Sequence, residues 1–319
     1  MHDCKRLLDA VERYIAKADD DLEEILAEEG FAEPGLTVAR ASQIEDAITE
    51  ALEQETELFI TSAETAFDVE EFAERIWPGV KLDDQTAEKI TEIFKEQLGE
   101  FLPELIDPYL KQTDAGLSVL SVSKKTTAWI ESWSEELGSM MKLTSHTQLE
   151  NILKTNLDAG NGIQDFITDL QNSGIREERY RARTTAITES LRAHSVAQEE
   201  SIQQSPAVEE KEWVHTGSFR NDPRPNHQAI SGQIVPKNEP FVLTGEDGST
   251  YYPQYPRDPI LPAGESINCH CIHRGIVSEK VLGLSLAERK RLQAEAIAEM
   301  DDAWEKELDA KNKAKAGIE

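Results

Sequence analysis

Residues 239–252 have the sequence EPFVLTGEDGSTYY, and this stretch decides the class of fold. Two short runs rich in β-branched and aromatic residues flank a turn in which Asp247 precedes Gly248. This pair favours a tight β-hairpin turn, so we expect two antiparallel strands here. Most of the remaining chain has helical periodicity. The sequence therefore predicts an α+β fold that is predominantly α, with a hairpin inside a small α+β module.

The chain before this module is helical in pattern. Apolar residues recur every three or four positions in three successive segments, as expected for amphipathic helices. A turn is predicted at 77–79 and interruptions near the two prolines at 103 and 108. The three apolar seams consist of Leu8, Val11, Ile15, Ala18, Leu22 and Ile25; of Ile44, Ile48, Leu52 and Phe59; and of Ile90, Phe94, Leu98 and Leu102.

Four regions follow from these patterns. An acidic helical region over 1–120 precedes a second helical region over 121–210, with separate helices predicted at 124–141, 145–158, 162–172 and 175–203. The α+β module spans 211–278 and ends with a strand over 272–277. A C-terminal helical tail occupies 279–319. The short N-terminal seam, 8–25, predicts packing against other helices of this chain or of a partner.

Charge is distributed unevenly along the 319 residues. The net charge is −29, and residues 1–120 contain 31 acidic side chains against 10 basic ones. Such a surface repels the phosphates of duplex DNA and keeps a protein soluble. It is also compatible with an electrostatic partner surface or with mimicry of DNA. No apolar run is long enough to span a bilayer, so we expect no membrane partner. Three cysteines do not make a disulfide framework, which indicates a cytosolic origin.

Side chains that could take part in catalysis or metal binding are concentrated between 212 and 273. This segment contains four of the seven histidines and two of the three cysteines. Asp222, Arg224 and His227 lie within six residues in a proline-restricted loop. They are compatible with an active site, but we favour an internal clamp of ion pairs and hydrogen bonds, because an irregular loop needs such bonding.

Cys269 and Cys271 flank His270 near the end of the module. In an extended segment both sulfurs face the same side, and a disulfide between them would be strained. Zinc binding would need further ligands, for which His227 and His215 are the candidates. A spacing of one residue is a weak zinc signal. We favour two reduced, buried thiols and expect no cofactor, with zinc as the alternative.

A basic stripe stands out in this acidic chain. Arg176, Arg179 and Arg183 recur on one helical face. Pairing with nearby acidic residues is the favoured interpretation, and contact with DNA or an acidic partner is the alternative.

A metal-dependent nuclease that uses His227 and the two cysteines is the rival function. A ββα-metal nuclease needs a catalytic histidine on a strand, followed by a helix that supplies a second ligand. Between His227 and Asn268 the chain instead contains a hairpin and several prolines, so the fit is poor. No P-loop, dinucleotide fingerprint or serine-hydrolase elbow is present.

Several uncommon elements occur together in a specific order. The chain contains Arg183-Thr-Thr-Ala-x-Thr-Glu189, then Trp213, then Asp222-x-Arg224-x-x-His227 followed by Gly232, then Phe241, and finally Asn268-Cys269-x-Cys271. Over residues 145–277 this pattern resembles the phage Mu F-like minor head protein family. His270 replaces the arginine usual between the two cysteines in that family.

The resemblance implies a minor head protein of a tailed phage or prophage, without enzymatic activity. It implies head morphogenesis as the function, with the portal protein and the major capsid or scaffold protein as partners. Phage DNA, packaged or ejected, is a further candidate partner. The expected location is the capsid interior or portal of the virion, and the host cytoplasm during assembly. In this interpretation Trp213, Asp222, Arg224, His227, Gly232, Asn268, Cys269 and Cys271 form a structural motif.

Overall fold

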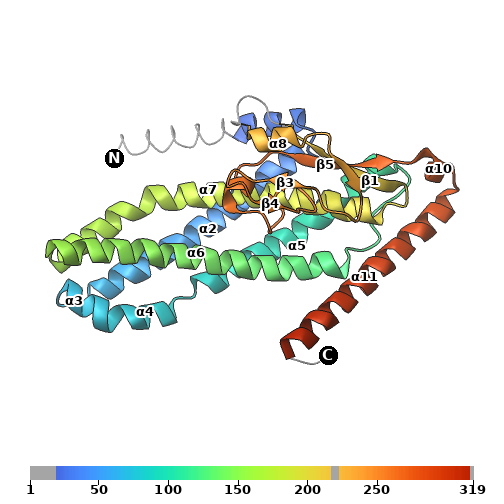
Figure 1. The fold of residues 1–319 in the computed structure, drawn as a ribbon. Helices are drawn as coiled ribbons and strands as arrows, with labels where there is room; N and C mark the ends of the chain where they lie inside the picture. The colour runs from blue at the N-terminus through green and yellow to red at the C-terminus, as the bar shows by residue number, and fades with distance from the viewer. Residues whose placement is uncertain (1–18, 217–222, 317–319) are drawn as a thin grey trace. The chain divides into compact units, whose positions relative to one another are not determined.

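The computed structural model describes residues 19–216 and 223–316, with the side chains of 174–178 excepted. The part of the N-terminal seam from Leu8 to Ala18 therefore lies outside the described residues. Long helices dominate, and two small antiparallel sheets form within the C-terminal part of the chain (Figure 1). The protein is thus predominantly α with a small β component, as the sequence predicts.

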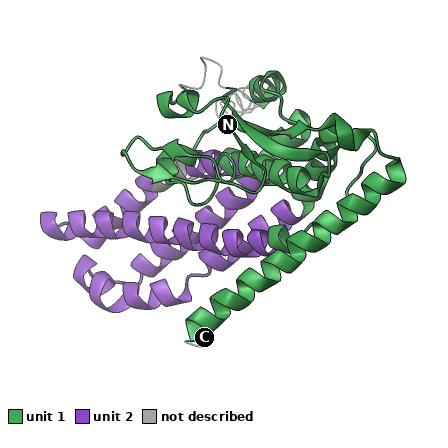
Figure 2. Cartoon of the chain, turned by 45° about the vertical axis from the view of Figure 1, so that its right-hand side comes forward, with its two compact units in different colours: residues 1–41, 100–127, 187–319 green, residues 42–99, 128–186 purple. Residues whose placement is uncertain are grey.

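The chain forms two compact units, each assembled from segments that are distant in sequence (Figure 2). Unit 1 comprises residues 1–41, 100–127 and 187–319, and unit 2 comprises 42–99 and 128–186. Four long helices contribute residues to both units: α2 (Pro34–Ala63), α5 (Thr86–Thr113), α6 (Lys124–Ala159) and α7 (Ile163–Gln204). The four contiguous regions expected from the sequence remain a prediction about domain organisation.

The core of unit 2 is apolar and rich in aromatic side chains. It gathers Phe59, Phe72, Trp77 and Phe166 with aliphatic residues of α6 and α7. The Trp77 and Phe59 rings meet edge to face, with centroids 5.4 Å apart, an arrangement that aromatic rings prefer. Burial of these large side chains is the main stabilising contribution to this unit.

The helix interruptions that the sequence predicts at prolines are absent from the structure. The turn expected at 77–79 is wrong, because helix α4 (Trp77–Asp83) begins there, directly after α3 (Val69–Glu71) and the π-helical turn Phe72–Ile76. Pro78 lies in the first turn of α4, where its missing N–H costs little. The interruption expected near Pro103 and Pro108 is also wrong, since both lie inside α5. Four neighbouring apolar residues, 101, 102, 105 and 106, have no exposed surface, and their burial outweighs the proline penalty.

Two further predicted helix boundaries are absent. The segments expected at 124–141 and 145–158 form the single helix α6, and those at 162–172 and 175–203 form α7, which passes through Gly174. A glycine inside a helix costs only about 1 kcal/mol, which packing offsets. Residues 188–198 of α7 are all buried, although many of them are polar.

Unit 1 contains both sheets. Strand β1 (Val208–Val214) lies between β2 (Ile234–Pro236) and β5 (Ile272–Val277), and both pairings are antiparallel. The predicted hairpin is confirmed by the pairing of β3 (Leu243–Thr244) with β4 (Thr250–Tyr251). Trp213 pairs with His273 across β1 and β5. This register sets the positions of the cysteines that precede β5.

Short helices and the tail complete unit 1. Helices α8 (Pro225–Ala229), α9 (Ala263–Ser266) and α10 (Glu279–Leu282) connect the strands and lead to α11 (Leu286–Ala316). Arg289 of α11 forms an ion pair with Asp114 at 2.7 Å. Asp301 accepts a hydrogen bond at 2.7 Å from the backbone N–H of Lys124, at the start of α6. The first half of the predicted C-terminal tail therefore packs on its own unit.

Candidate functional site

The motif residues of the C-terminal module meet in one buried cluster of unit 1. Trp213 comes from β1, Phe241 from the segment before β3, and Cys269 and Cys271 from the loop before β5. The Trp213 and Phe241 rings are 5.3 Å apart at an interplanar angle of 80°. Both aromatic rings are fully buried, and each cysteine is 2% exposed. The cluster is a small apolar core with two sulfur atoms in it.

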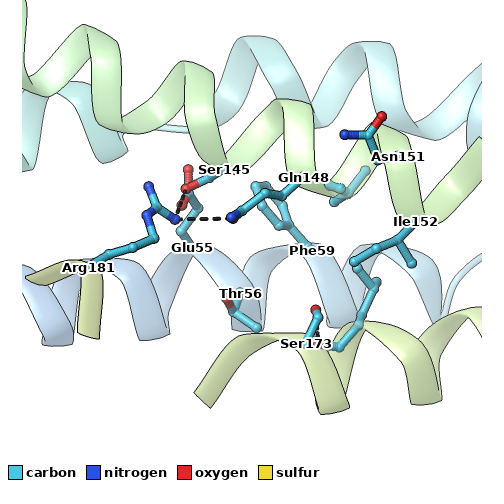
Figure 3. Close-up of a pocket in the computed structure, with 11 residues that line it drawn as sticks. Glu55, Thr56, Phe59, Ser145, Gln148, Asn151, Ile152, Ser173 and Arg181 are labelled. Carbon is cyan, nitrogen blue, oxygen red and sulfur yellow. Dashed lines mark hydrogen bonds between the residues drawn. The ribbon is translucent and has the colours of Figure 1, made fainter. Parts of the chain in front are cut away.

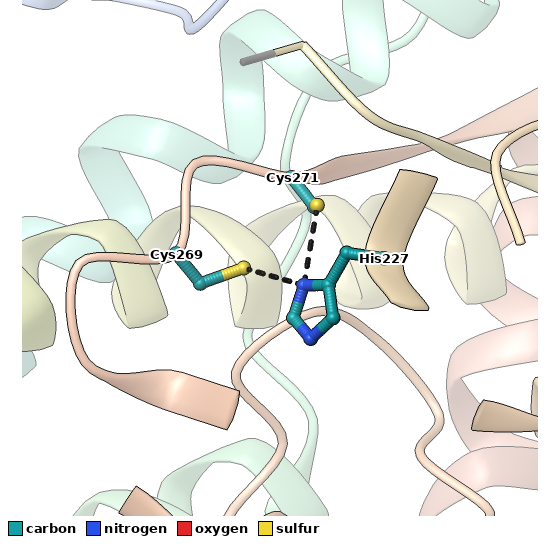
Figure 4. A group of neighbouring side chains, drawn as sticks. All are labelled: His227, Cys269 and Cys271. Carbon is teal, nitrogen blue, oxygen red and sulfur yellow. Dashed lines mark hydrogen bonds between the residues drawn. The ribbon is translucent and has the colours of Figure 1, made fainter. Parts of the chain in front are cut away.

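His227 projects from α8 onto both sulfurs (Figure 4). Its Nδ1 atom lies 3.5 Å from the Sγ atom of Cys269 and 3.6 Å from that of Cys271. The histidine residue is itself 1% exposed. Both cysteines are free. One histidine nitrogen therefore lies next to two thiols in a site closed to solvent.

Glu265 orients this histidine. A carboxylate oxygen of Glu265 lies 2.8 Å from Nε2 of His227, so Nε2 carries a proton and donates it to the carboxylate. The same carboxylate accepts hydrogen bonds from the Asn226 side chain at 3.0 Å and from the backbone N–H of Glu246 at 2.8 Å. The lone pair of Nδ1 is consequently directed toward the sulfurs.

A second histidine approaches from the end of β1. Nδ1 of His215 lies 3.5 Å from Sγ of Cys271, and the backbone N–H of His215 donates to the Ser231 hydroxyl at 3.0 Å. Burial lowers the pKa of His215, which favours the neutral imidazole. A ring nitrogen of His215 and one of His227 therefore both lie beside the sulfur of Cys271.

A buried arginine holds the cysteine loop. Arg257 is fully buried, and its guanidinium donates to the carbonyl oxygens of Cys269 and Cys271, the latter at 3.0 Å. It also donates to the Ser195 hydroxyl of α7 at 2.7 Å. Asn268, just before the loop, has a left-handed backbone with φ of 53°, which asparagine tolerates better than most residues. The loop is thereby anchored from both sides.

A buried charged network includes Lys211, which lies on the same strand as Trp213. Lys211 is fully buried, and its ammonium group contacts the Glu199 carboxylate at 3.0 Å, while Nε2 of His273 lies 3.1 Å from that carboxylate. Burial alone would raise the pKa of Glu199, but the hydrogen bond from His273 and the charge of Lys211 lower it to about 2. The carboxylate is therefore ionised and ties α7 to β1 and β5.

Comparison with known proteins identifies the family to which this arrangement belongs. Residues 131–274 match a family described as "Phage Mu protein F like protein". The chain is 36% identical over 219 residues to the "Uncharacterized protein YqbB" of Bacillus subtilis (strain 168), which covers 69% of this chain and 70% of that protein. The chain belongs to the phage Mu F-like family.

Membership of the phage Mu F-like family indicates a phage head protein that acts in head morphogenesis. The matched region contains all motif residues of the cluster described above. No solved structure matches the chain. Within residues 19–216 and 223–316, no helix combines the length and the apolar character needed to cross a lipid bilayer.

The structure places the remaining motif residues of this Mu F-like chain as follows. Arg224 precedes α8, and its guanidinium donates to the backbone carbonyl of Ile267 at 2.7 Å. Gly232 has a φ of 85°, and its N–H donates to the carbonyl of Trp213 at 2.8 Å. Asp222 lies outside the described residues. Arg224 and His227 thus both bind the 265–267 segment, and the three-residue clamp stays a prediction.

The basic stripe of this Mu F-like protein is engaged within unit 2. Arg179 and Arg183 both form ion pairs with Glu45 of α2, at 3.4 and 2.9 Å. The side chain of Arg176 lies outside the described residues. Pairing with Glu45 reduces the charge that the two arginines offer to DNA. Their role in contacts with nucleic acid or a partner remains a prediction.

The histidine geometry differs from that of a ββα-metal nuclease. His227 lies on the short helix α8 and not on a strand. Asn268 is exposed and lies in the loop before β5. The structure therefore adds no support for a nuclease.

Sequence reasoning missed two residues that build the site. Glu265 lies 38 residues from His227, and Arg257 lies 12 and 14 residues from the cysteines whose carbonyls it binds. Neither belongs to a motif of known spacing. The feature that reveals both residues is burial of a charged side chain next to the motif. Burial is visible only in the folded chain.

Unit 2 contains a separate cavity of about 230 Å³ between α2, α6 and α7 (Figure 3). Arg181 on its wall donates to the side chains of Ser145 and Gln148 at 3.4 and 3.2 Å. Glu55, also on the wall, is 3% exposed. Burial raises the pKa of Glu55 to about 8. This carboxyl group is therefore protonated at neutral pH.

Proposed function

We propose that this protein is a minor head protein that binds the portal and the interior of the capsid shell during assembly of a tailed-phage or prophage head. The match of residues 131–274 to the Mu F-like family carries the proposal. It takes in the whole of α7 and the cluster around His227, so it includes the core of the α+β module and not only a helical pattern. The portal protein and the major capsid or scaffold protein are the proposed partners.

The surface supports a role in assembly. Unit 2 exposes large apolar side chains, of which Phe67 and Leu82 are each 86% exposed and Leu143 is 67% exposed. Exposed apolar residues are the ones that a partner protein covers most favourably. The net charge of −29 disfavours a protein that coats DNA. Contact with packaged or ejected DNA would use Arg179 and Arg183 once they part from Glu45.

We propose no enzymatic activity. The motif residues serve the internal order of the module: Glu265 binds His227, Arg257 binds the cysteine carbonyls, and Arg224 binds the Ile267 carbonyl. These bonds hold irregular backbone in place, as loops without regular pairing require.

Co-expression with the portal protein encoded in the same phage or prophage tests the proposal. We expect the two proteins to co-elute in size-exclusion chromatography at low salt. The double variant Leu82→Glu/Leu143→Glu should weaken co-elution, because it places charge on the apolar surface, while the Tm of the free protein stays within a few degrees. A double variant at two exposed acidic positions, Glu92→Gln/Glu96→Gln, is the matched control. A portal that purifies free of this protein, although the protein is in excess, contradicts the proposal.

A further inference from the structure

We propose that unit 1 binds one structural zinc ion through Sγ of Cys269, Sγ of Cys271, Nδ1 of His227 and Nδ1 of His215. From the sequence alone, two buried thiols are the favoured interpretation, because the cysteine spacing by itself is a weak zinc signal. The fold supplies what that spacing lacks, since two histidines from other elements converge on the same sulfurs.

The distances fit a tetrahedral ion. The three nitrogen–sulfur separations are 3.5, 3.6 and 3.5 Å. With bonds of about 2.3 Å to sulfur and about 2.0 Å to nitrogen, two ligands of a tetrahedral zinc ion lie about 3.5 Å apart. The ligand atoms of His227, Cys269 and Cys271 are all within 4.8 Å of one another. An ion therefore fits these three side chains as they stand, whereas His215, which contacts Cys271 but is outside this group, completes the tetrahedron by a shift of its side chain.

Hydrogen bonding alone satisfies the cluster poorly. Nε2 of His227 donates its proton to Glu265, so only the single lone pair of Nδ1 faces the two thiols. One lone pair accepts one S–H hydrogen bond well, and the second thiol has only the weakly accepting sulfur of the neighbouring cysteine as its partner. A zinc ion uses both sulfurs as thiolates and the imidazole as a neutral ligand. Two thiolates balance the charge of the ion, as a buried site requires.

The side chains around His227 and the two cysteines orient them and shield them from water, as in structural metal sites. The pair Glu265–His227 is the carboxylate–histidine arrangement that fixes the tautomer of a zinc ligand, and Glu265 is itself held by Asn226 and the Glu246 N–H. Arg257 fixes the loop between the two cysteines through their carbonyls. Trp213 and Phe241 shield the sulfurs from water.

The fourth ligand is held less firmly than the other three. His215 is half-buried, and its Nε2 atom has no hydrogen-bond partner among the described residues. An orienting partner raises zinc affinity by roughly 10-fold to 100-fold. Replacement of His215 should accordingly weaken zinc binding, whereas replacement of His227 or either cysteine should abolish it.

The alternative chemistry for the same residues is a nucleophilic thiol, with His227 as base and Glu265 as the orienting group. Such a site needs one thiol that a substrate reaches. Here both thiols are 2% exposed. A second cysteine beside the first has no role in that scheme, whereas a zinc site uses both.

Elemental analysis tests the proposal directly. The full-length protein, carrying a tag without histidines and purified without added metal, should contain about one zinc per chain. His215→Ala should raise the Kd for zinc by at least roughly 10-fold, because losing a ligand costs more than losing an orienting partner, and Cys269→Ser and His227→Ala should contain none. His270→Gln is the matched control, because His270 lies between the cysteines but binds Glu29 at 2.6 Å. It should retain zinc.

A spectroscopic measurement on the wild type covers the case in which the ligand variants do not fold. Protein in which cobalt(II) replaces zinc should show the visible bands of a tetrahedral ion and thiolate-to-metal charge transfer. Chelation should increase hydrogen exchange in residues 223–277 more than in α5 and α6, because site formation is coupled to folding. Wild-type protein with less than about a tenth of a zinc per chain and no tetrahedral cobalt spectrum would overturn the proposal. Rapid alkylation of Cys269 in the native protein would also overturn it, in favour of the nucleophile. Failure of portal binding has no bearing on either measurement.

Discussion

At position 257 an arginine side chain lies wholly inside unit 1, and its described hydrogen-bond acceptors are all neutral oxygen atoms: two carbonyls and the Ser195 hydroxyl. Burial lowers the pKa of Arg257, although arginine remains charged throughout the accessible pH range. Its planar group reaches the cysteine loop and α7 at once. A single residue therefore connects the motif loop to the longest helix.

Replacement of Arg257 tests this connection. Arg257→Met removes the donors and leaves buried acceptors unsatisfied, so we expect a loss of about 3 kcal/mol or more in the free energy of unfolding. Arg257→Lys should not restore it, because a lysine lacks the forked geometry. The control is Arg274→Met: Arg274 pairs with Glu212 but its side chain is 65% exposed, and the change should cost about 0.5 kcal/mol or less. Urea unfolding that gives equal values for the two methionine variants would contradict the connection.

At the scale of elements, α5 and α6 approach closely within unit 2 because Gly138 has no side chain. A Cβ atom placed there would lie only 2.3 Å from the carbonyl oxygen of Ala87. Carbonyl oxygens of a helix backbone cannot move aside as a side chain can. Thr91 donates to the carbonyl of Ser134 at 3.3 Å across the same contact. The packing of these two helices therefore depends on this glycine.

The same substitution should have opposite effects at two helical glycines. Gly138→Ala should force α5 and α6 apart and cost about 1–3 kcal/mol. Gly99→Ala, in α5, meets no atom within 4 Å and should stabilise the helix by about 0.5–1 kcal/mol. The measurement is the midpoint of urea unfolding for both variants beside the wild type. A stabilising Gly138→Ala would show that the helices are not in contact at this position.

At the scale of the molecule, each unit contains a buried titratable side chain whose pKa is shifted by burial. The pKa is lowered in unit 1 and raised in unit 2. In unit 1, His194 is fully buried between the hydroxyls of Thr37 and Tyr109, each at 2.7 Å, and burial lowers its pKa to about 3. In unit 2, burial raises the pKa of Glu55 to about 8. In the folded protein at neutral pH, the side chains of His194 and Glu55 are therefore both uncharged.

Stability should consequently fall on both sides of an intermediate pH. Unfolded histidine has a pKa of about 6.5, so the contribution of His194 is complete above that pH and is lost as the pH falls toward 3. Unfolded glutamate has a pKa of about 4.3, so the contribution of Glu55 is complete below that pH and is lost as the pH rises through 8. Each loss should reach at most roughly 5 kcal/mol.

Two neutral variants separate the effects. His194→Gln should reduce the slope of unfolding free energy between pH 6.5 and 4.5 without changing the alkaline slope. Glu55→Gln should do the reverse and should make the protein more stable than the wild type at pH 8.5. Urea unfolding over this pH range checks both expectations. Unchanged slopes in either variant would assign the pH dependence to other groups.

Local sequence patterns by themselves determined the hairpin and the final strand of the module, and the family. The residues of the hairpin and of β5 are contiguous, and their β-propensity and turn chemistry act over a few positions. The order of Trp213, His227 and the two cysteines likewise indicates the Mu F-like family without any coordinates. The apolar seam of α2 predicted its buried residues, because periodicity along one helix needs no partner.

Only the tertiary structure decided where helices continue and which residues meet. Pro103 and Gly174 disfavour a helix locally, yet α5 and α7 pass through them, because burial of distant apolar surface contributes more than the local penalty. The joining of β1 to β5 brings His215 next to Cys271, and the packing of α8 brings His227 to both sulfurs. Glu265 and Arg257 show no pattern in the sequence. Contacts between residues far apart in sequence depend on the packing of the whole chain, and no local pattern specifies them.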